Sequence, residues 1–129
     1  MMLFNIVKWT NMKIAVFGSG YVGLVTAACF AEVGNQVIGI DVDSGKVECL
    51  NQGDSPIYEP NLTDLLKSNH QSGHLLFTTE PQAAIETAEI IVIAVRTPVQ
   101  KDGSVSLKYI DQAATTLSQF LRFYVELSG

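Results

Sequence analysis

Three closely spaced glycines separate an apolar run from a long apolar stretch of helix-forming sequence. Residues 13–17 read Lys-Ile-Ala-Val-Phe, a pattern typical of a strand that is buried on both faces. The next six residues are Gly18-Ser19-Gly20-Tyr21-Val22-Gly23, and nearly all residues from 21 to 33 are apolar. Gly34 then supplies the kind of residue that ends a helix. The sequence therefore predicts a buried strand, a tight glycine turn and a buried helix.

The apolar stretch around this turn is long enough to cross a membrane, but its glycines argue against that. Residues 14–34 hold a single charge, Glu32, over 21 positions. Gly18 and Gly20 near its start favour a strand, a turn and a helix instead. The whole chain has 8 Lys and Arg against 13 Asp and Glu, for a net charge of −5. This balance argues against the binding of nucleic acid and of anionic membrane surfaces.

Strand-like and helix-like segments alternate along the rest of the chain. We expect strands over 36–40, 74–78 and 90–95, the last fully buried, and helices over 44–51, 62–67 and 106–121. A further helix capped by Thr79 is expected to run to Ala88. The alternation predicts one α/β domain with a parallel sheet and helices on both faces. Right-handed crossovers favour the strand order 3-2-1-4.

The glycine turn matches the pattern G-x-G-x-x-G of Rossmann-type dinucleotide sites. The pattern alone is weak, but here it follows a strand and opens a helix. Gly18 allows the tight turn, Gly20 lets the backbone approach a pyrophosphate, and Gly23 permits close packing of helix on strand. The helix N-terminus adds free N–H groups and a positive dipole end. The sequence therefore predicts a site for the pyrophosphate of a dinucleotide.

Asp41 lies at the end of the second expected strand, 18 residues after Gly23. An acid at about this spacing accepts hydrogen bonds from the adenosine ribose hydroxyls. A 2′-phosphate at the same place would meet a like charge. We therefore expect NAD rather than NADP as the cofactor.

Residues 12–121 resemble the UDP-glucose/GDP-mannose dehydrogenase family, and in particular its UDP-glucose 6-dehydrogenases. Beyond the glycine turn, the resemblance rests on Gly39-Ile-Asp-Val42, Pro56-Ile-Tyr-Glu-Pro60, Ile93-Ala-Val-Arg-Thr-Pro98, Asp102-Gly103 and Leu107-Lys-Tyr-Ile110. The glycine pattern is shared by many dehydrogenases, whereas Pro56-Ile-Tyr-Glu-Pro60 is much more specific.

The resemblance implies an NAD-linked oxidation of UDP-glucose to UDP-glucuronate in nucleotide-sugar and polysaccharide biosynthesis, with two NAD and a cysteine thioester. By the family pattern, Gly18, Ser19, Gly20, Tyr21, Val22 and Gly23 hold the pyrophosphate, and Asp41 and Lys46 serve the adenosine ribose. Val95, Thr97 and Pro98 line the cofactor cleft at the end of the fourth strand, and the loop with Glu59 belongs near the same cleft.

Arg96 departs from the family pattern, which has a small or amide residue before Thr-Pro. Arginine is bulky where the backbone lies close to NAD. It either obstructs the site or turns toward a phosphate, and our hypothesis is that Arg96 weakens NAD binding.

The family's catalytic cysteine, lysine and asparagine lie beyond residue 129, so we assign no catalytic residue. We expect residues 1–11 to be an appendage, 12–121 an incomplete NAD-binding domain that stops after the fourth strand and its helix, and 122–129 a divergent tail. Truncation, frame disruption or deliberate shortening would each explain this. Cys29, in the apolar helix, is expected to be an inert small hydrophobe, and Cys49 a structural or exposed thiol.

We therefore expect a fragment that binds NAD without catalysis, with UDP-glucose bound only by a full-length relative. The alternatives are a non-enzymatic remnant that has lost NAD, or the same domain from a GDP-mannose or UDP-N-acetylmannosamine dehydrogenase. The cysteine usage favours the reducing cytoplasm.

The remaining patterns have simpler explanations. We interpret His70 and His74 as part of a solvated loop rather than a metal site. Tyr109, Ile110, Ala113, Ala114 and Leu117 have helical spacing and are expected to form a core face. If no fifth strand is present, the apolar fourth strand exposes an edge, which predicts self-association.

Overall fold

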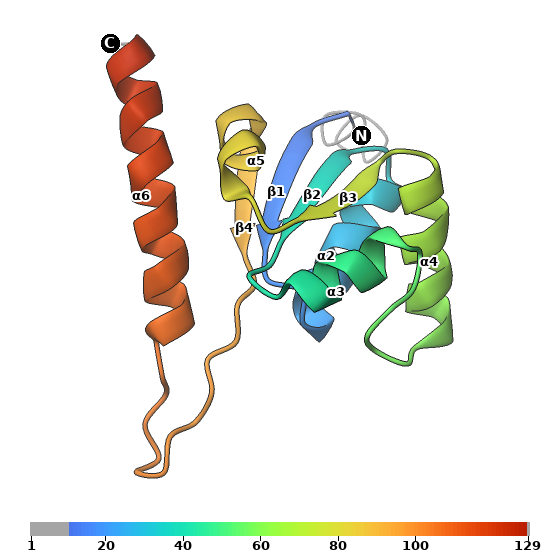
Figure 1. Ribbon diagram of the computed structural model, residues 1–129, viewed down its shortest axis with the longest axis horizontal. Helices are drawn as coiled ribbons and strands as arrows, with labels where there is room; N and C mark the ends of the chain where they lie inside the picture. Colours follow the sequence, from blue (N-terminus) through green and yellow to red (C-terminus); the bar gives the residue numbers. More distant parts are fainter. Residues whose placement is uncertain (1–10, 129) are drawn as a thin grey trace, which may run out of the picture.

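A parallel sheet with helices on both faces forms the domain (Figure 1). The computed structural model describes the backbone of residues 11–128 and the side chains of residues 11–120. In chain order the elements are β1 (Lys13–Phe17), α2 (Tyr21–Glu32), β2 (Gln36–Ile40), α3 (Ser44–Asn51), α4 (Pro60–Gln71), β3 (Leu75–Thr78), α5 (Pro81–Thr87), β4 (Ile90–Ile93) and α6 (Lys108–Ser128). The described strands are all parallel and lie in the order β3-β2-β1-β4. The expected fold class and strand order are confirmed.

The alternation of side chains along β1 builds two separate cores. Ile14 and Val16 point to the face that α2, α3 and α4 cover, while Ala15 and Phe17 point to the face of α5 and α6. The two faces follow from the handedness of the connections. The chain moves outward from β1 to β3 on one face and then crosses back to β4 on the other. The carboxyl ends of β1 and β4 therefore meet where the direction of winding reverses, which is where such sheets bind ligands.

Three helices differ from the expected bounds, and one of them, α6, spans Lys108–Ser128 rather than residues 106–121. α4 begins at Pro60, earlier than expected, because the Glu59 carboxylate accepts a hydrogen bond from the Asn61 N–H at 3.3 Å and so caps it. Thr79 does not cap α5: the N-cap position is Glu80, and no side chain caps this helix. Thr78 acts just before it instead, because its hydroxyl oxygen accepts a hydrogen bond from the Glu80 N–H at 3.0 Å.

Strand β4 is shorter and less buried than its apolar pattern predicts. It ends at Ile93, and its residues are half-buried or exposed, with Ile93 42% exposed. The strand is exposed because it lies at the edge of the sheet: within the described residues β4 pairs with β1, and no strand pairs with its outer edge. The expectation of full burial is therefore wrong, whereas the expected exposed edge is present in the described part of the chain.

Helix α2 is buried on one side only. Its buried positions are Gly23, Leu24, Ala27, Ala28 and Ala31, which follow the helical repeat. Cys29 lies between them on the exposed side, so it does not pack as the small hydrophobe that was expected. On α6, Ala113 is buried but Ala114 is exposed, so Ala114 does not belong to the expected core face.

The two histidines each have a hydrogen-bonding partner. The His70 ring lies 3.0 Å from the Leu75 carbonyl oxygen, and the His74 ring lies 2.9 Å from the Ser72 hydroxyl. His70 belongs to α4 rather than to a loop, and both rings are half-buried. Among the side chains of residues 11–120, no three His, Cys, Asp or Glu gather as they would around a metal ion. No helix in that range is long and apolar enough to span a membrane.

Candidate dinucleotide-binding site

The glycine turn lies at the carboxyl ends of three neighbouring strands. The Gly18 N–H donates to the Ile40 carbonyl at the end of β2, at 2.8 Å, and the Ala94 N–H donates to the Phe17 carbonyl at the end of β1, also at 2.8 Å. Asp41 follows β2 directly. The sheet therefore brings the turn, Asp41 and the segment after β4 to the winding reversal.

Gly18 and Gly23 are required by close backbone packing. Gly18 has a φ of +103°, and a Cβ there would lie 2.4 Å from the Ala94 carbonyl oxygen. A Cβ on Gly23 would lie 2.1 Å from the Gly18 carbonyl oxygen. Both glycines thus hold α2 close to the turn and to the end of β4.

Gly20 differs from the other two because its surroundings are open. A Cβ at Gly20 would meet no atom within 4 Å, and no side chain caps α2 at this residue. The first bond of the helix runs from the Leu24 N–H to the Gly20 carbonyl, so the N–H groups of residues 21–23 have no partner within the helix. These donors and the helix dipole suit an anionic group such as a pyrophosphate. The side chains of Tyr21 and Val22, in the same turn, are exposed.

The Asp41 carboxylate is held by three hydrogen bonds. Its Oδ2 accepts from the Ser19 N–H at 3.0 Å and from the Ser19 hydroxyl, and its Oδ1 accepts from the Asp43 N–H at 2.9 Å. Burial raises the pKa of Asp41, but these bonds and the positive charge of Lys46 outweigh burial and hold the pKa below its ordinary value. Asp41 is therefore a charged acceptor at neutral pH, and Lys46 lies near enough to act on it.

The segment after β4 reaches the site only in part. Val95 is half-buried against the core on the α5 face, and its backbone N would lie 3.2 Å from a Cβ on Gly18. Thr97 and Pro98 are exposed in the loop that leads to the Val99–Val105 bridge. Glu59 caps α4, and the structure gives it no contact with the glycine turn. Val95 thus joins the turn, whereas the roles of Thr97, Pro98 and Glu59 stay predictions.

Arg96 has a partner that the sequence analysis did not identify. Its Nη2 donates a hydrogen bond of 2.8 Å to the Tyr109 hydroxyl, although Tyr109 was assigned to the core face of the last helix. Tyr109 is only half-buried. The sequence signal that could have indicated this pair is the position of Tyr109 in the first turn of α6, directly after the loop that follows Arg96.

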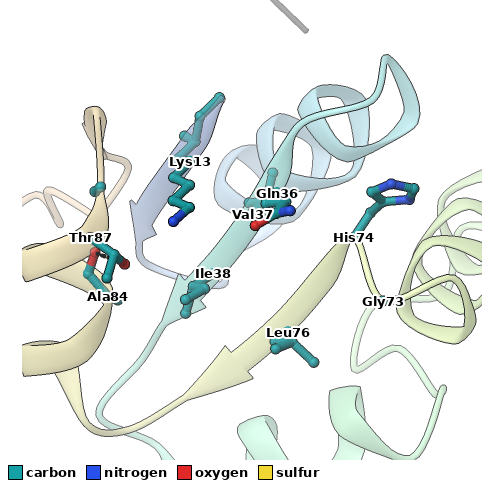
Figure 2. Close-up of a pocket in the computed structure, with 11 residues that line it drawn as sticks. Lys13, Gln36, Val37, Ile38, Gly73, His74, Leu76, Ala84 and Thr87 are labelled. Atoms are coloured by element: carbon teal, nitrogen blue, oxygen red, sulfur yellow. Dashed lines mark hydrogen bonds between the residues drawn. The ribbon is translucent and has the colours of Figure 1, made fainter. Parts of the chain in front are cut away.

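Two hollows of the structure lie outside this site. One cavity of about 190 Å³ lies at the amino ends of the strands, with Lys13, Ile38 and Leu76 on the sheet and Thr87 on α5 (Figure 2). The other is an open hollow between α3 and α4 around Pro56 and Tyr58. Neither contains the glycine turn or Asp41, so the candidate site is defined here by its hydrogen-bond donors and acceptors.

A family model described as the NAD binding domain of the UDP-glucose/GDP-mannose dehydrogenase family matches residues 12–125. The chain is 47% identical over 112 residues to UDP-glucose 6-dehydrogenase TuaD of Bacillus subtilis, covering 87% of this chain and 24% of that protein. It is 42% identical over 111 residues to GDP-mannose 6-dehydrogenase of Pseudomonas putida, covering 86% and 25%.

Solved structures agree with these sequence matches. A ternary complex of GDP-mannose dehydrogenase from Pseudomonas aeruginosa superposes with a TM-score of 0.84 at 41% identity, covering 86% of this chain and 26% of that one. UDP-glucose dehydrogenase from Pyrobaculum islandicum superposes with a TM-score of 0.81 at 39% identity, with the same coverage of 86% and 26%. The chain thus spans about a quarter of the length of these relatives.

Proposed function

This chain belongs to the UDP-glucose/GDP-mannose dehydrogenase family through its NAD-binding domain, and from that membership we propose that it binds NAD at the glycine turn and Asp41. One observation carries the proposal. The unpartnered N-terminus of α2, open at Gly20, lies beside the charged carboxylate of Asp41, which Ser19 joins to the same turn. Donors for a pyrophosphate and an acceptor for a ribose are thus adjacent.

Each residue has a distinct part in the proposed binding. The N–H groups of residues 21–23 serve the pyrophosphate, Gly20 leaves room for it, and Asp41 accepts a ribose hydroxyl with Lys46 nearby. Val95, Thr97 and Pro98 line the cleft on the side of β4. NAD, when bound, supplies the acceptor for a hydride. This chain's own residues bind and orient it.

The reaction itself is proposed for a full-length relative rather than for these 129 residues. We propose oxidation of UDP-glucose to UDP-glucuronate, with the catalytic cysteine outside this chain. The 47% identity to a UDP-glucose 6-dehydrogenase supports this substrate, although a second UDP-glucose 6-dehydrogenase and a GDP-mannose 6-dehydrogenase are each 42% identical. The alternatives are GDP-mannose and UDP-N-acetylmannosamine. The cytoplasmic location and the role in polysaccharide biosynthesis stay predictions.

A domain that has kept the fold and lost NAD is the second candidate function. It rests on Arg96, which departs from the small or amide residue that the resemblance implies at this position. The hydrogen bond from Arg96 to Tyr109 favours retained binding, because it engages the guanidinium with α6. The intact glycines and Asp41 favour the same conclusion.

Calorimetric titration of NAD and NADP into the purified chain tests the proposal. We expect saturable binding that prefers NAD and is lost in Asp41→Ala. The matched control is Asp64→Ala, which removes an exposed carboxylate on α4 and should leave binding unchanged. A folded wild-type chain that binds neither dinucleotide would support the second candidate and overturn the first.

A further inference from the structure

Ser19 is buried within the glycine turn, whereas the side chains of Tyr21 and Val22 in the same turn are exposed. Its exposed fraction is 1%, one of the lowest values for a polar residue among those described. Both of its donors, the N–H and the hydroxyl, are directed to one atom, Oδ2 of Asp41. A buried hydroxyl of this kind does not reach a ligand, so any effect of Ser19 on the site passes through Asp41.

The remaining hydrogen-bonding capacity of Asp41 is small. A carboxylate offers about four acceptor positions, two on each oxygen. Ser19 occupies two positions on Oδ2, and the Asp43 N–H occupies one on Oδ1. One position on Oδ1 remains for a ligand. Ser19 and the Asp43 N–H thus fix the orientation of the carboxylate, and its charge and one acceptor position remain available to a ligand.

From this arrangement we propose that Ser19 is a positioning residue that sets the choice between a ribose 2′-hydroxyl and a 2′-phosphate, by fixing the charged carboxylate of Asp41. The inference rests on the proposed binding of a dinucleotide at this site. A fixed acceptor favours the hydroxyl, and a fixed negative charge repels the phosphate. Ser19 therefore determines how strongly the chain prefers NAD over NADP.

The charged groups around Asp41 are few among the described residues. Lys46 on α3 lowers the pKa of Asp41 through its charge. The Asp43 carboxylate is engaged with α3, where its Oδ1 accepts from the N–H groups of Gly45 and Lys46 at 3.0 Å and 3.2 Å. The Ser19 hydroxyl contributes the largest lowering of the Asp41 pKa, against the opposing effect of burial. Removing that hydroxyl should therefore raise the pKa of Asp41.

The preference for NAD over NADP depends on pH through the charge of Asp41. Repulsion of a 2′-phosphate requires ionised Asp41, so the preference for NAD is present above the pKa of Asp41 and is lost as pH falls through it. Without the Ser19 hydroxyl that loss occurs at a higher pH. A role in folding alone would not move this midpoint.

The experiment measures the ratio of NAD to NADP affinity against pH in the wild type, Ser19→Ala and Ser19→Thr. For Ser19→Ala we expect the ratio at neutral pH to fall about tenfold, as for the loss of a hydrogen bond to a charged group, and its midpoint to rise. Ser19→Thr, which keeps the hydroxyl, should restore both. The matched control is Ser104→Ala, because the Ser104 hydroxyl donates to Asp102 in an exposed loop.

A second measurement covers the case in which threonine does not fit a buried site. Titration of the Asp41 carboxyl by carbon NMR in the unliganded chain should show a higher midpoint in Ser19→Ala than in the wild type. If the wild type binds NAD and Ser19→Ala keeps the same ratio or the same midpoint, the inference alone is overturned. If the wild type binds neither dinucleotide, the proposed function is overturned, and so is the inference that rests on it.

Discussion

The guanidinium of Arg96 lies over the ring of Tyr109, with its central carbon 4.8 Å from the ring centroid, and donates a 2.8 Å hydrogen bond to the same residue's hydroxyl. The pair joins the segment after β4 to the first turn of α6. It provides a contact between the two ends of the long loop that contains Thr97 and Pro98. Arg96 is thereby engaged by α6, although it stands only two residues after Ala94, whose carbonyl abuts Gly18.

Replacing Arg96 with glycine should strengthen NAD binding. We expect the gain to be small, because Tyr109 already engages the guanidinium, so that glycine removes only the bulk of an exposed side chain beside the segment expected to line the cleft. Calorimetric titration of NAD into wild type and Arg96→Gly measures the effect. Equal or weaker binding by the glycine variant would reject the hypothesis that Arg96 weakens binding.

Replacing Tyr109 should loosen the connection between β4 and α6. Tyr109→Leu removes both the ring contact and the hydrogen bond, and we expect a loss of roughly 1 kcal/mol in the free energy of unfolding, because the arginine is exposed. Tyr109→Phe keeps the ring and should lose less. Urea denaturation measures both variants, and identical values for Leu and Phe would show that the ring contact contributes nothing.

The glycines of the turn should respond in opposite ways to alanine. In Gly23→Ala the new Cβ would lie 2.1 Å from the Gly18 carbonyl oxygen, so we expect destabilisation of about 3 kcal/mol or more, measured by thermal and urea denaturation. Gly20→Ala meets nothing within 4 Å and has a φ of −75°, so it should fold normally yet bind NAD more weakly. A stable Gly23→Ala variant, or unchanged NAD binding by Gly20→Ala, would contradict this division of roles.

The parts of the fold that were predictable from sequence are those that local patterns determine. The order of strands and the place of the glycine turn follow from alternating apolar runs and from the handedness of crossovers. The place of Asp41 beside the glycine turn was predictable because it depends on the spacing between the turn and the end of the second strand. Lys46 and Val95 were placed by the family pattern.

The features that the sequence did not show depend on contacts between distant segments. The burial of β4 could not be read from its four apolar residues, because exposure is set by which strands lie beside it. Ser19 was assigned to the pyrophosphate, and its contact with Asp41 appears only when the two loops are brought together. The pairing of Arg96 with Tyr109 joins residues 13 positions apart across an irregular loop, where no repeat constrains the spacing.

Acid should weaken the fold through Asp41. Its pKa is below the ordinary value of 3.8, so its ionised form is favoured by the folded chain. This stability is fully present above the unfolded value and is lost as pH falls through the folded value, which places the loss below about pH 4. Urea denaturation between pH 7 and pH 3 should show a smaller decline for Asp41→Asn than for the wild type. Parallel declines would contradict the assignment.

We propose that two copies of the chain associate through the outer edge of β4. The backbone groups of a strand alternate between its two sides, so those directed away from β1 have no strand partner among the described residues. The strand reads Ile-Ile-Val-Ile, without the lysine or proline that usually protects an edge. Light scattering at rising concentration should therefore show dimers or larger species, whereas a sharp monomer peak at high concentration would contradict the prediction.

A charge placed on this edge should suppress the association. Ile93 is already 42% exposed, so Ile93→Lys adds a protecting charge with little loss of packing. Val42→Lys is the matched control, because Val42 is 89% exposed and lies after β2, away from the edge. We expect Ile93→Lys to shift the chain toward monomer and Val42→Lys to leave its association unchanged. Equal effects of the two lysines would mean that added positive charge, rather than the β4 edge, governs self-association.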